Sequence, residues 1–173
     1  MRYFFIRQDL ELRNSLQYRD FDINSACHIF TKEDKDQLED YVMLYLDGDG
    51  KEIRHDFLQH PVTMFSQRYR DILYAYEPDL FFQDVYLIQK ENLLQYRYVH
   101  VLMDQLEVIG NSTEYYPNGT VKRLLLDSAK IGRHHLFMLS GHHRKDPMVS
   151  LPLAESILRR KPMGICFEEV EAE

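Results

Sequence analysis

The sequence predicts an α+β protein with a mainly antiparallel sheet, and three observations support that class. A pattern of a serine, a helical run of apolar residues and a proline twelve positions after the serine occurs twice, with the serines at Ser66 and Ser150. A short apolar segment follows each proline, Pro78 and Pro162. Several other segments alternate apolar and polar residues between turn signals, as strands do. We therefore expect two similar helix-then-strand units, at about residues 65–88 and 149–170, with both helices packed on a sheet face.

The composition is that of one globular domain. The chain has 173 residues, of which 45% are hydrophobic and 28% are charged. This length and apolar content suffice for a single core spanning residues 1–173. The repeated pattern also allows a division into two pseudo-equivalent halves, about 1–103 and 104–173.

Net charge and cysteine content restrict the partners and the location. The formal charge of -7 argues against a general nucleic-acid binder, which needs a dense positive surface, and favours a basic partner. The two cysteines, Cys27 and Cys166, form no metal or disulfide motif, which fits a reducing cytoplasm. No apolar run approaches the length of a membrane span or a signal peptide, so we expect a cytoplasmic protein without membrane insertion.

The first half is expected to contain several short elements before the first unit. Residues 3–7 and 41–46 are predicted strands, and the second of these ends in a turn at residues 47–50. Residues 31–40 are predicted to form a short solvated helix, with Thr31 and Asp34 resembling a capping box. Residues 56–58 are expected to form one helical turn before Pro61.

Each unit is predicted from its apolar spacing. In the first unit, Ser66 caps a helix, and strands follow at residues 81–88 and 95–103, the second placing Val99, Val101 and Met103 on one side. In the second half, strands at 121–127 and 135–139 precede a helix at 151–160, capped by Ser150, and a strand at 165–170. The residues expected on the buried helix faces are Phe65, Tyr69, Ile72, Leu73 and Tyr76 in the first unit, and Val149, Leu153 and Ile157 in the second.

The residues with metal-binding potential favour structural interpretations. The segment Asp47-Gly48-Asp49-Gly50 opens like a calcium loop, but Glu52 occupies the position that requires glycine and Leu58 the position of the bidentate glutamate. The pairs His134-His135 and His142-His143 lie on predicted strands or turns, where adjacent side chains point to opposite faces. We expect a tight turn and surface or edge histidines, and no metal or cofactor.

The residues with catalytic potential do not form a recognisable set. Cys166 lies in an apolar strand, which predicts a buried thiol with a raised pKa. Cys27-His28 is the better position for a reactive thiol, although no third orienting group can be named. Acidic pairs such as Asp104 with Glu107, and Glu168 with Glu169, are expected to be solvated surface residues. The sequence therefore predicts no catalytic residues.

The second half resembles a bacterial family that was first catalogued as a domain of unknown function and later grouped with predicted immunity proteins of polymorphic toxin systems. The segments that carry the resemblance are Lys122–Asp127, Lys130-Ile131, His135–Leu139, Met148-Val149-Ser150 with Leu153-Ala154, and Gly164–Val170. Phe65-Ser66 and Asp104–Glu107 extend it, so that it covers about residues 56–169.

The resemblance implies a non-catalytic binding protein that neutralises a cognate bacterial toxin, encoded nearby, by direct binding. The acidic balance of the chain is compatible with a basic toxin, and Tyr, Phe or Arg residues on exposed loops are expected to carry most of the binding energy. Two alternatives remain open: a small cytoplasmic enzyme with a site assembled around Cys27 and His28, and a general interaction module. The sequence does not define the oligomeric state.

Overall fold

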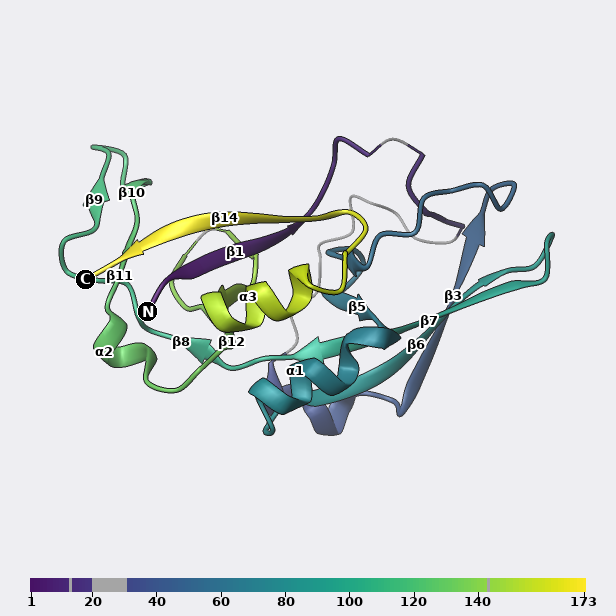
Figure 1. The fold of residues 1–173 in the computed structure, drawn as a ribbon, viewed down its shortest axis with the longest axis horizontal. Helices are drawn as coiled ribbons and strands as arrows, with labels where there is room; N and C mark the ends of the chain where they lie inside the picture. The colour runs from purple at the N-terminus through teal and green to yellow at the C-terminus, as the bar shows by residue number, and fades with distance from the viewer. Residues whose placement is uncertain (13, 20–30, 143) are drawn as a thin grey trace.

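A computed structural model describes residues 1–12, 14–19, 31–142 and 144–173. It is a sheet-rich mixed α/β fold in which two six-stranded sheets meet around a pair of helices. In Figure 1 the two helices lie side by side at the centre, and the two sheets extend in opposite directions from them.

The β1 sheet, named for its central strand, has the order β11-β14-β1-β13-β12-β8. Its strands are β1 (Tyr3–Gln8), β8 (Gln105–Leu106), β11 (Leu125–Leu126), β12 (Leu136–Leu139), β13 (Met148–Ser150) and β14 (Ile165–Ala172). The helix α3 (Leu151–Leu158) connects β13 to β14, which lie on either side of β1 and pair antiparallel with it.

The β7 sheet has the order β2-β3-β6-β7-β5-β4. Its strands are β2 (Gln17–Tyr18), β3 (Tyr41–Asp47), β4 (Phe57–Leu58), β5 (Met64–Ser66), β6 (Phe81–Gln89) and β7 (Leu94–Leu102). A 3-10 turn, η2 (Gln67–Tyr69), and the helix α1 (Arg70–Tyr76) connect β5 to β6, which lie on either side of β7 and pair antiparallel with it.

The two sheets share one arrangement of five strands. The orders β11-β14-β1-β13-β12 and β3-β6-β7-β5-β4 have the same relative directions: the first pair is parallel and the following pairs are antiparallel. The central strand differs in its origin. β7 follows β6 along the chain, whereas β1 comes from the start of the sequence.

Smaller elements surround the sheets. They are the 3-10 helix η1 (Lys32–Gln37), the ribbon of β9 (Glu114–Tyr115) and β10 (Val121–Arg123), and the short helix α2 (Ser128–Ile131). The side chain of Asp127 caps α2 by accepting hydrogen bonds from the backbone N–H groups of Ala129 and Lys130.

One apolar core joins both sheets and both helices. The predicted helix residues Tyr69, Leu73, Leu153 and Ile157 are all fully buried in it. The strand residues that complete this core include Ile6, Phe65, Val99, Val101, Leu136 and Val149. The helices also contact each other directly, because the Tyr76 hydroxyl donates to the Pro152 carbonyl oxygen at 3.1 Å. Separate apolar clusters cover the opposite face of each sheet.

Two further predictions are confirmed. Thr31 and Asp34 form the expected capping box at the start of η1. Val99, Val101 and Met103 all face the shared core. Within the part of the chain that the structure describes, no helix has the length and apolar character needed to cross a bilayer.

Three predictions need correction. The sheets are mixed, because β3–β6, β11–β14 and β8–β12 are parallel pairs. Residues 57–58 form strand β4 and not a helical turn, because they pair with β5. Ser66 and Ser150 occupy the N-cap positions, but neither side chain makes a capping hydrogen bond.

Candidate functional site: a cationic pocket beside an exposed tyrosine face

A pocket of about 580 Å³ lies between the strand β7 of one sheet and the loop after α3, which leads into the other sheet. We call it the cationic pocket. Four separate segments line it: residues 53–56, the start of η2, the strand β7, and the loop after α3. Its lining residues are Ile53, Arg54, Asp56, Ser66, Arg68, Tyr96, Arg97, Tyr98, Lys161 and Met163.

The carboxylate of Asp56 holds the walls of this pocket together. Its Oδ2 atom accepts hydrogen bonds from Arg68 Nη2 at 2.5 Å and from the Met163 backbone N–H at 2.7 Å. The Asp56 backbone N–H donates to the Met163 carbonyl, and its carbonyl accepts from the Ser66 N–H, both at 2.8 Å. One residue therefore links β5, η2 and the loop after α3.

Gly164 and His55 form a tight contact behind this wall. Gly164 has a φ of +70°, and a Cβ atom there would lie 2.0 Å from His55 Cδ2, so no larger residue fits. The buried His55 ring contacts the Asp9 carbonyl through Nε2 at 3.1 Å, and the His55 carbonyl accepts from the Tyr98 hydroxyl at 2.7 Å. These contacts place Arg54 and Asp56, on either side of His55, at the pocket.

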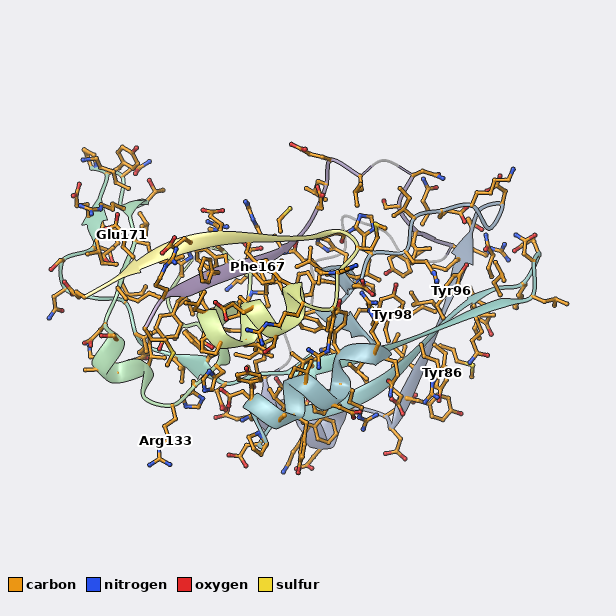
Figure 2. All side chains as sticks on the ribbon, in the orientation of Figure 1. Tyr86, Tyr96, Tyr98, Arg133, Phe167 and Glu171 are labelled. Atoms are coloured by element: carbon orange, nitrogen blue, oxygen red, sulfur yellow. The ribbon has the colours of Figure 1, made fainter. Side chains whose placement is uncertain are left out.

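Three of the four cations that line the pocket have no ion-pair partner among the described residues: Arg54, Arg97 and Lys161. Aromatic rings hold two of them. The Arg54 guanidinium lies 4.8 Å from the Tyr96 ring centroid, and that of Arg97 lies 5.6 Å from the Tyr86 centroid. Figure 2 shows Tyr86, Tyr96 and Tyr98 along the adjacent strands of this sheet.

Burial and charge determine the protonation of the pocket walls. Burial lowers the pKa of the Arg68 guanidinium, but the attraction of Asp56 outweighs it and the net pKa is raised. Burial raises the pKa of the Tyr98 hydroxyl, and that of Tyr69 beneath Arg68 is also raised, mainly by burial. At neutral pH both phenols are therefore neutral, and the arginine is charged.

An exposed aromatic surface adjoins the pocket on the same sheet. Strand register places Met43 beside Tyr86, and Tyr86 beside Arg97, on one face. Tyr41 and Met43 are 51% and 49% exposed. Together with Tyr41, Tyr45 and Ile88, the residues Met43 and Tyr86 form what we call the tyrosine face, which contains a shallow hollow of about 310 Å³.

The tyrosine face is the uncovered end of the surface on which α1 packs. Phe82, Val99 and Val101 on the same face contact the shared core. The strands β3, β6 and β7 then continue beyond α1, as Figure 1 shows, so no helix of the described residues covers their outer ends. Arg97 belongs to both surfaces and connects the tyrosine face with the cationic pocket.

The two cysteine predictions have different outcomes. Cys166 is exposed, and the prediction that it is buried is wrong. Ile165 and Phe167 take the positions in β14 that pack against the core, so Cys166 points the other way, opposite Arg7. Burial, followed by the charge of Asp9, raises the pKa of its thiol, in the expected direction. Cys27 and His28 lie outside the described residues.

A serine–histidine contact that the sequence did not indicate lies at the start of β12. His135 Nδ1 and Ser150 Oγ are 2.7 Å apart, and the His135 ring packs edge-on against Tyr76. However, Ser150 is fully buried, and the nearby Glu77 carboxylate accepts from the backbone N–H groups of His135 and Leu136, not from the ring. The set lacks both the access and the orientation of a catalytic triad, and it ties α1 to β12 and β13.

The other histidines also make structural contacts. His134 Nδ1 lies 3.7 Å from a Glu77 oxygen and 3.9 Å from an Asp104 oxygen, and Asp104 pairs with Lys32. The buried His142 stacks on Phe5, and its neighbour His143 lies outside the described residues. Within the described ranges, no group of three or more candidate ligands is placed to hold a metal ion.

The remaining acidic motifs have assigned partners. In the segment 47–50, the Glu52 carboxylate accepts from the N–H groups of Asp49 and Gly50, and this closes the predicted turn. Glu168 bonds Arg144 through two nitrogens, and Glu169 bonds Arg2 in the same way. Glu107, near Asp104 in sequence, is exposed.

Sequence reasoning missed the cationic pocket because its cations are separated by up to about a hundred residues. Arg54, Arg68, Arg97 and Lys161 belong to no common motif. One local signal was available in β7, where Tyr96-Arg97-Tyr98 combines the residue types that dominate binding surfaces.

No protein-family model matches the chain, and no curated protein sequence matches it.

Proposed function

We propose that this chain is a non-catalytic binding protein that neutralises a cognate bacterial protein toxin, encoded nearby, by binding it directly. The observation that carries the proposal is the tyrosine face. It places the exposed Tyr41 and Met43, with the partly exposed Tyr86, on a paired sheet next to Arg97. Tyrosine and arginine are enriched among the residues that dominate binding energy, and methionine is enriched in interface cores.

The rigidity of this surface favours binding. Its residues lie on β3, β6 and β7, which pair over five to nine residues. A surface that is already ordered loses little conformational entropy when a partner docks. Sheet-borne tyrosines therefore supply contact area without a large ordering cost.

The net charge of this chain favours a basic partner. The chain carries a formal charge of -7, and this field attracts a basic protein at long range. The tyrosine face then provides the short-range contact. The resemblance of residues 56–169 to predicted immunity proteins supports the same partner class. A cytoplasmic location is part of this proposal, since the toxin would act there.

The test is coexpression with the toxic domain of the neighbouring gene, measuring cell survival and copurification. Wild-type protein is expected to protect the cells and form a complex. The double variant Tyr41→Ala/Met43→Ala is expected to weaken the complex at least tenfold, because about half of each side chain is available for burial by the partner.

The matched control is Tyr115→Ala/Tyr116→Ala, on and next to the β9–β10 ribbon. These tyrosines are equally exposed, at 53% and 51%, but lie away from the tyrosine face. This control is expected to protect as well as wild type. Killing that continues with wild-type protein and no complex would refute the toxin partner, whereas equal losses in both double variants would refute the surface.

A further inference from the structure

The cationic pocket concentrates positive charge in a protein that is acidic overall. Arg54, Arg97 and Lys161 line one cavity together with Arg68, and among the described residues of that lining Asp56 is the only carboxylate. That carboxylate is already shared by Arg68 and a backbone N–H group. Like charges that lie close together repel one another, and an anion bound among them would relieve that repulsion.

A second pocket in the molecule provides an internal comparison. It has a volume of about 370 Å³ and also contains three cations, Lys122, Arg123 and Arg144. Each of them pairs with a carboxylate: Lys122 with Glu114, Arg123 with Glu171, and Arg144 with Glu168. The protein therefore neutralises clustered cations on one side and leaves them unneutralised in the cationic pocket.

The cations of the cationic pocket are already oriented. The rings of Tyr96 and Tyr86 hold Arg54 and Arg97, and the Arg68 Nη2 atom is fixed by Asp56 and the Tyr69 hydroxyl. Arg68 Nε and Nη1 make no hydrogen bond within the described ranges, so these donors remain available. Pre-oriented guanidinium groups match the paired oxygens of phosphate and carboxylate groups.

Lys161 is brought to the pocket by an uncommon backbone conformation. It has a φ of +49°, in the left-handed region that costs a lysine about 1 kcal/mol. The next residue is Pro162, and the Lys161 carbonyl accepts a hydrogen bond from Arg68 at 3.3 Å. The tight turn after α3 thus carries the fourth cation to the wall opposite β7.

From these observations we propose that the cationic pocket binds a multiply charged oxyanion, whose charge is carried by clustered phosphate or carboxylate groups. The ligand class follows from four cations that line one pocket, a volume that admits a small molecule, and Arg68 guanidinium donors without a hydrogen-bond partner among the described residues. This site adjoins the tyrosine face and shares Arg97 with it, but the proposal does not depend on the toxin partner.

Isothermal titration calorimetry with inorganic pyrophosphate and with citrate tests the proposal. These probes carry similar negative charge on phosphate and on carboxylate groups, respectively. We expect saturable binding of at least one probe to the full chain. Affinity should fall as salt rises, because the contacts are charge-assisted. Tighter binding of pyrophosphate assigns the phosphate class, and tighter binding of citrate assigns the carboxylate class.

Variants locate the binding site. Arg54→Gln and Lys161→Gln are each expected to raise the Kd about tenfold, and Arg54→Lys is expected to retain part of the affinity because it keeps the charge but loses the guanidinium fork. The matched control is Arg133→Gln. Arg133 is exposed, forms no ion pair with a described residue, and projects into solvent away from the pocket in Figure 2. Its Kd should stay within about twofold of wild type.

Two results would overturn the proposal. One is the absence of saturable binding of both probes at millimolar concentration. The other is an Arg133→Gln effect as large as that of Arg54→Gln, which would indicate general charge attraction without a defined site. Thermal unfolding of each variant checks that it is folded, and because Arg54 and Lys161 are exposed, their substitution should leave the midpoint nearly unchanged.

Discussion

The β7 sheet and the β1 sheet share one arrangement of five strands but differ in the surfaces that they present. Strand register makes Tyr86 of β6 and Glu171 of β14 equivalent, because Val85 pairs with Tyr98 in one sheet as Val170 pairs with Tyr3 in the other. Tyr86 lies on the open tyrosine face, whereas Glu171 is paired with Arg123. The same strand arrangement thus carries an exposed aromatic surface in the β7 sheet and an ion-paired surface in the β1 sheet.

This contrast separates the residues that hold the fold from those that are available for binding. Across β14, Glu168 and Glu169 pair with arginines from other segments, which leaves little free charge. Around the cationic pocket, the arginines stack on tyrosines and have open donors. We therefore expect substitutions in the shared core to have similar effects in both halves, and surface substitutions to have different ones.

The largest expected effect comes from the shared core. Leu73 of α1 and Ile157 of α3 are both fully buried at matching positions in the repeated pattern. Leu73→Ala and Ile157→Ala should each lower the free energy of unfolding by about 3 kcal/mol, since each leaves a cavity in the same core. Urea unfolding measures this. A loss below about 1 kcal/mol in one variant only, or a split transition, would show that the halves are independent.

The next largest loss of stability is expected at the contact between the end of α1 and the start of β12. Glu77, at the end of α1, accepts hydrogen bonds from the N–H groups of His135 and Leu136. Glu77→Gln should cost about 2 kcal/mol, because hydrogen bonds to a charged acceptor in a buried site are weakened. Glu155→Gln, on the exposed side of α3, is the control and should leave the urea midpoint nearly unchanged. Equal midpoints for the two variants would contradict the assigned role.

A pH effect on stability is expected from a buried histidine of the β7 sheet. His100 is buried in β7, and burial lowers its pKa to about 4, whereas the matching residue of β1 is Phe5. The unfolded chain, with a histidine pKa near 6.5, binds the proton more readily than the folded chain. Stability is therefore fully present above about pH 6.5 and is lost as the pH falls toward 4, by about 2 kcal/mol at pH 5.

The measurement for this effect is urea unfolding between pH 7.5 and pH 5 for wild type and His100→Gln. The wild-type free energy of unfolding should fall with decreasing pH, and the variant should show a flatter profile over the same range. Profiles with the same slope would exclude His100 as the source of the pH dependence.

The smallest effect is expected for the exposed ion pairs. Glu169 of β14 pairs with Arg2. Asp84, at the matching position of β6, pairs with Arg70. Glu169→Gln should leave the urea midpoint unchanged within error, and Asp84→Asn should change it only slightly, because solvent screens both pairs. A clear loss of stability in Glu169→Gln would mean that the arginine–glutamate contacts on β14 hold the fold.

The sequence predicted what depends on neighbouring residues. The burial of Tyr69, Leu73, Leu153 and Ile157 follows from helical spacing alone. Strand order does not, since β1 and β14 come from opposite ends of the chain. The apolar neighbours of Cys166 also gave a wrong prediction of its burial, because one step along a strand reverses the face on which a side chain lies.

The candidate site could not be predicted for the same reason. Its cations become neighbours only when Asp56 joins β5, η2 and the loop after α3. Only Tyr96-Arg97-Tyr98 gave a local indication, and the tyrosine face is visible only once β3 and β6 are known to be parallel. The functional surfaces of this protein are products of its non-local pairing.

The position of β1 has a consequence for biosynthesis. The ribosome makes residues 3–8 long before their strand partners, which are residues 148–150 and 165–170. The β7 sheet, in contrast, pairs segments that all emerge by residue 102. A nascent chain can therefore assemble the β7 sheet while β1 still lacks its strand partners. Closing so long a loop is slow, so the last step of folding should be the insertion of the N-terminal segment between β13 and β14.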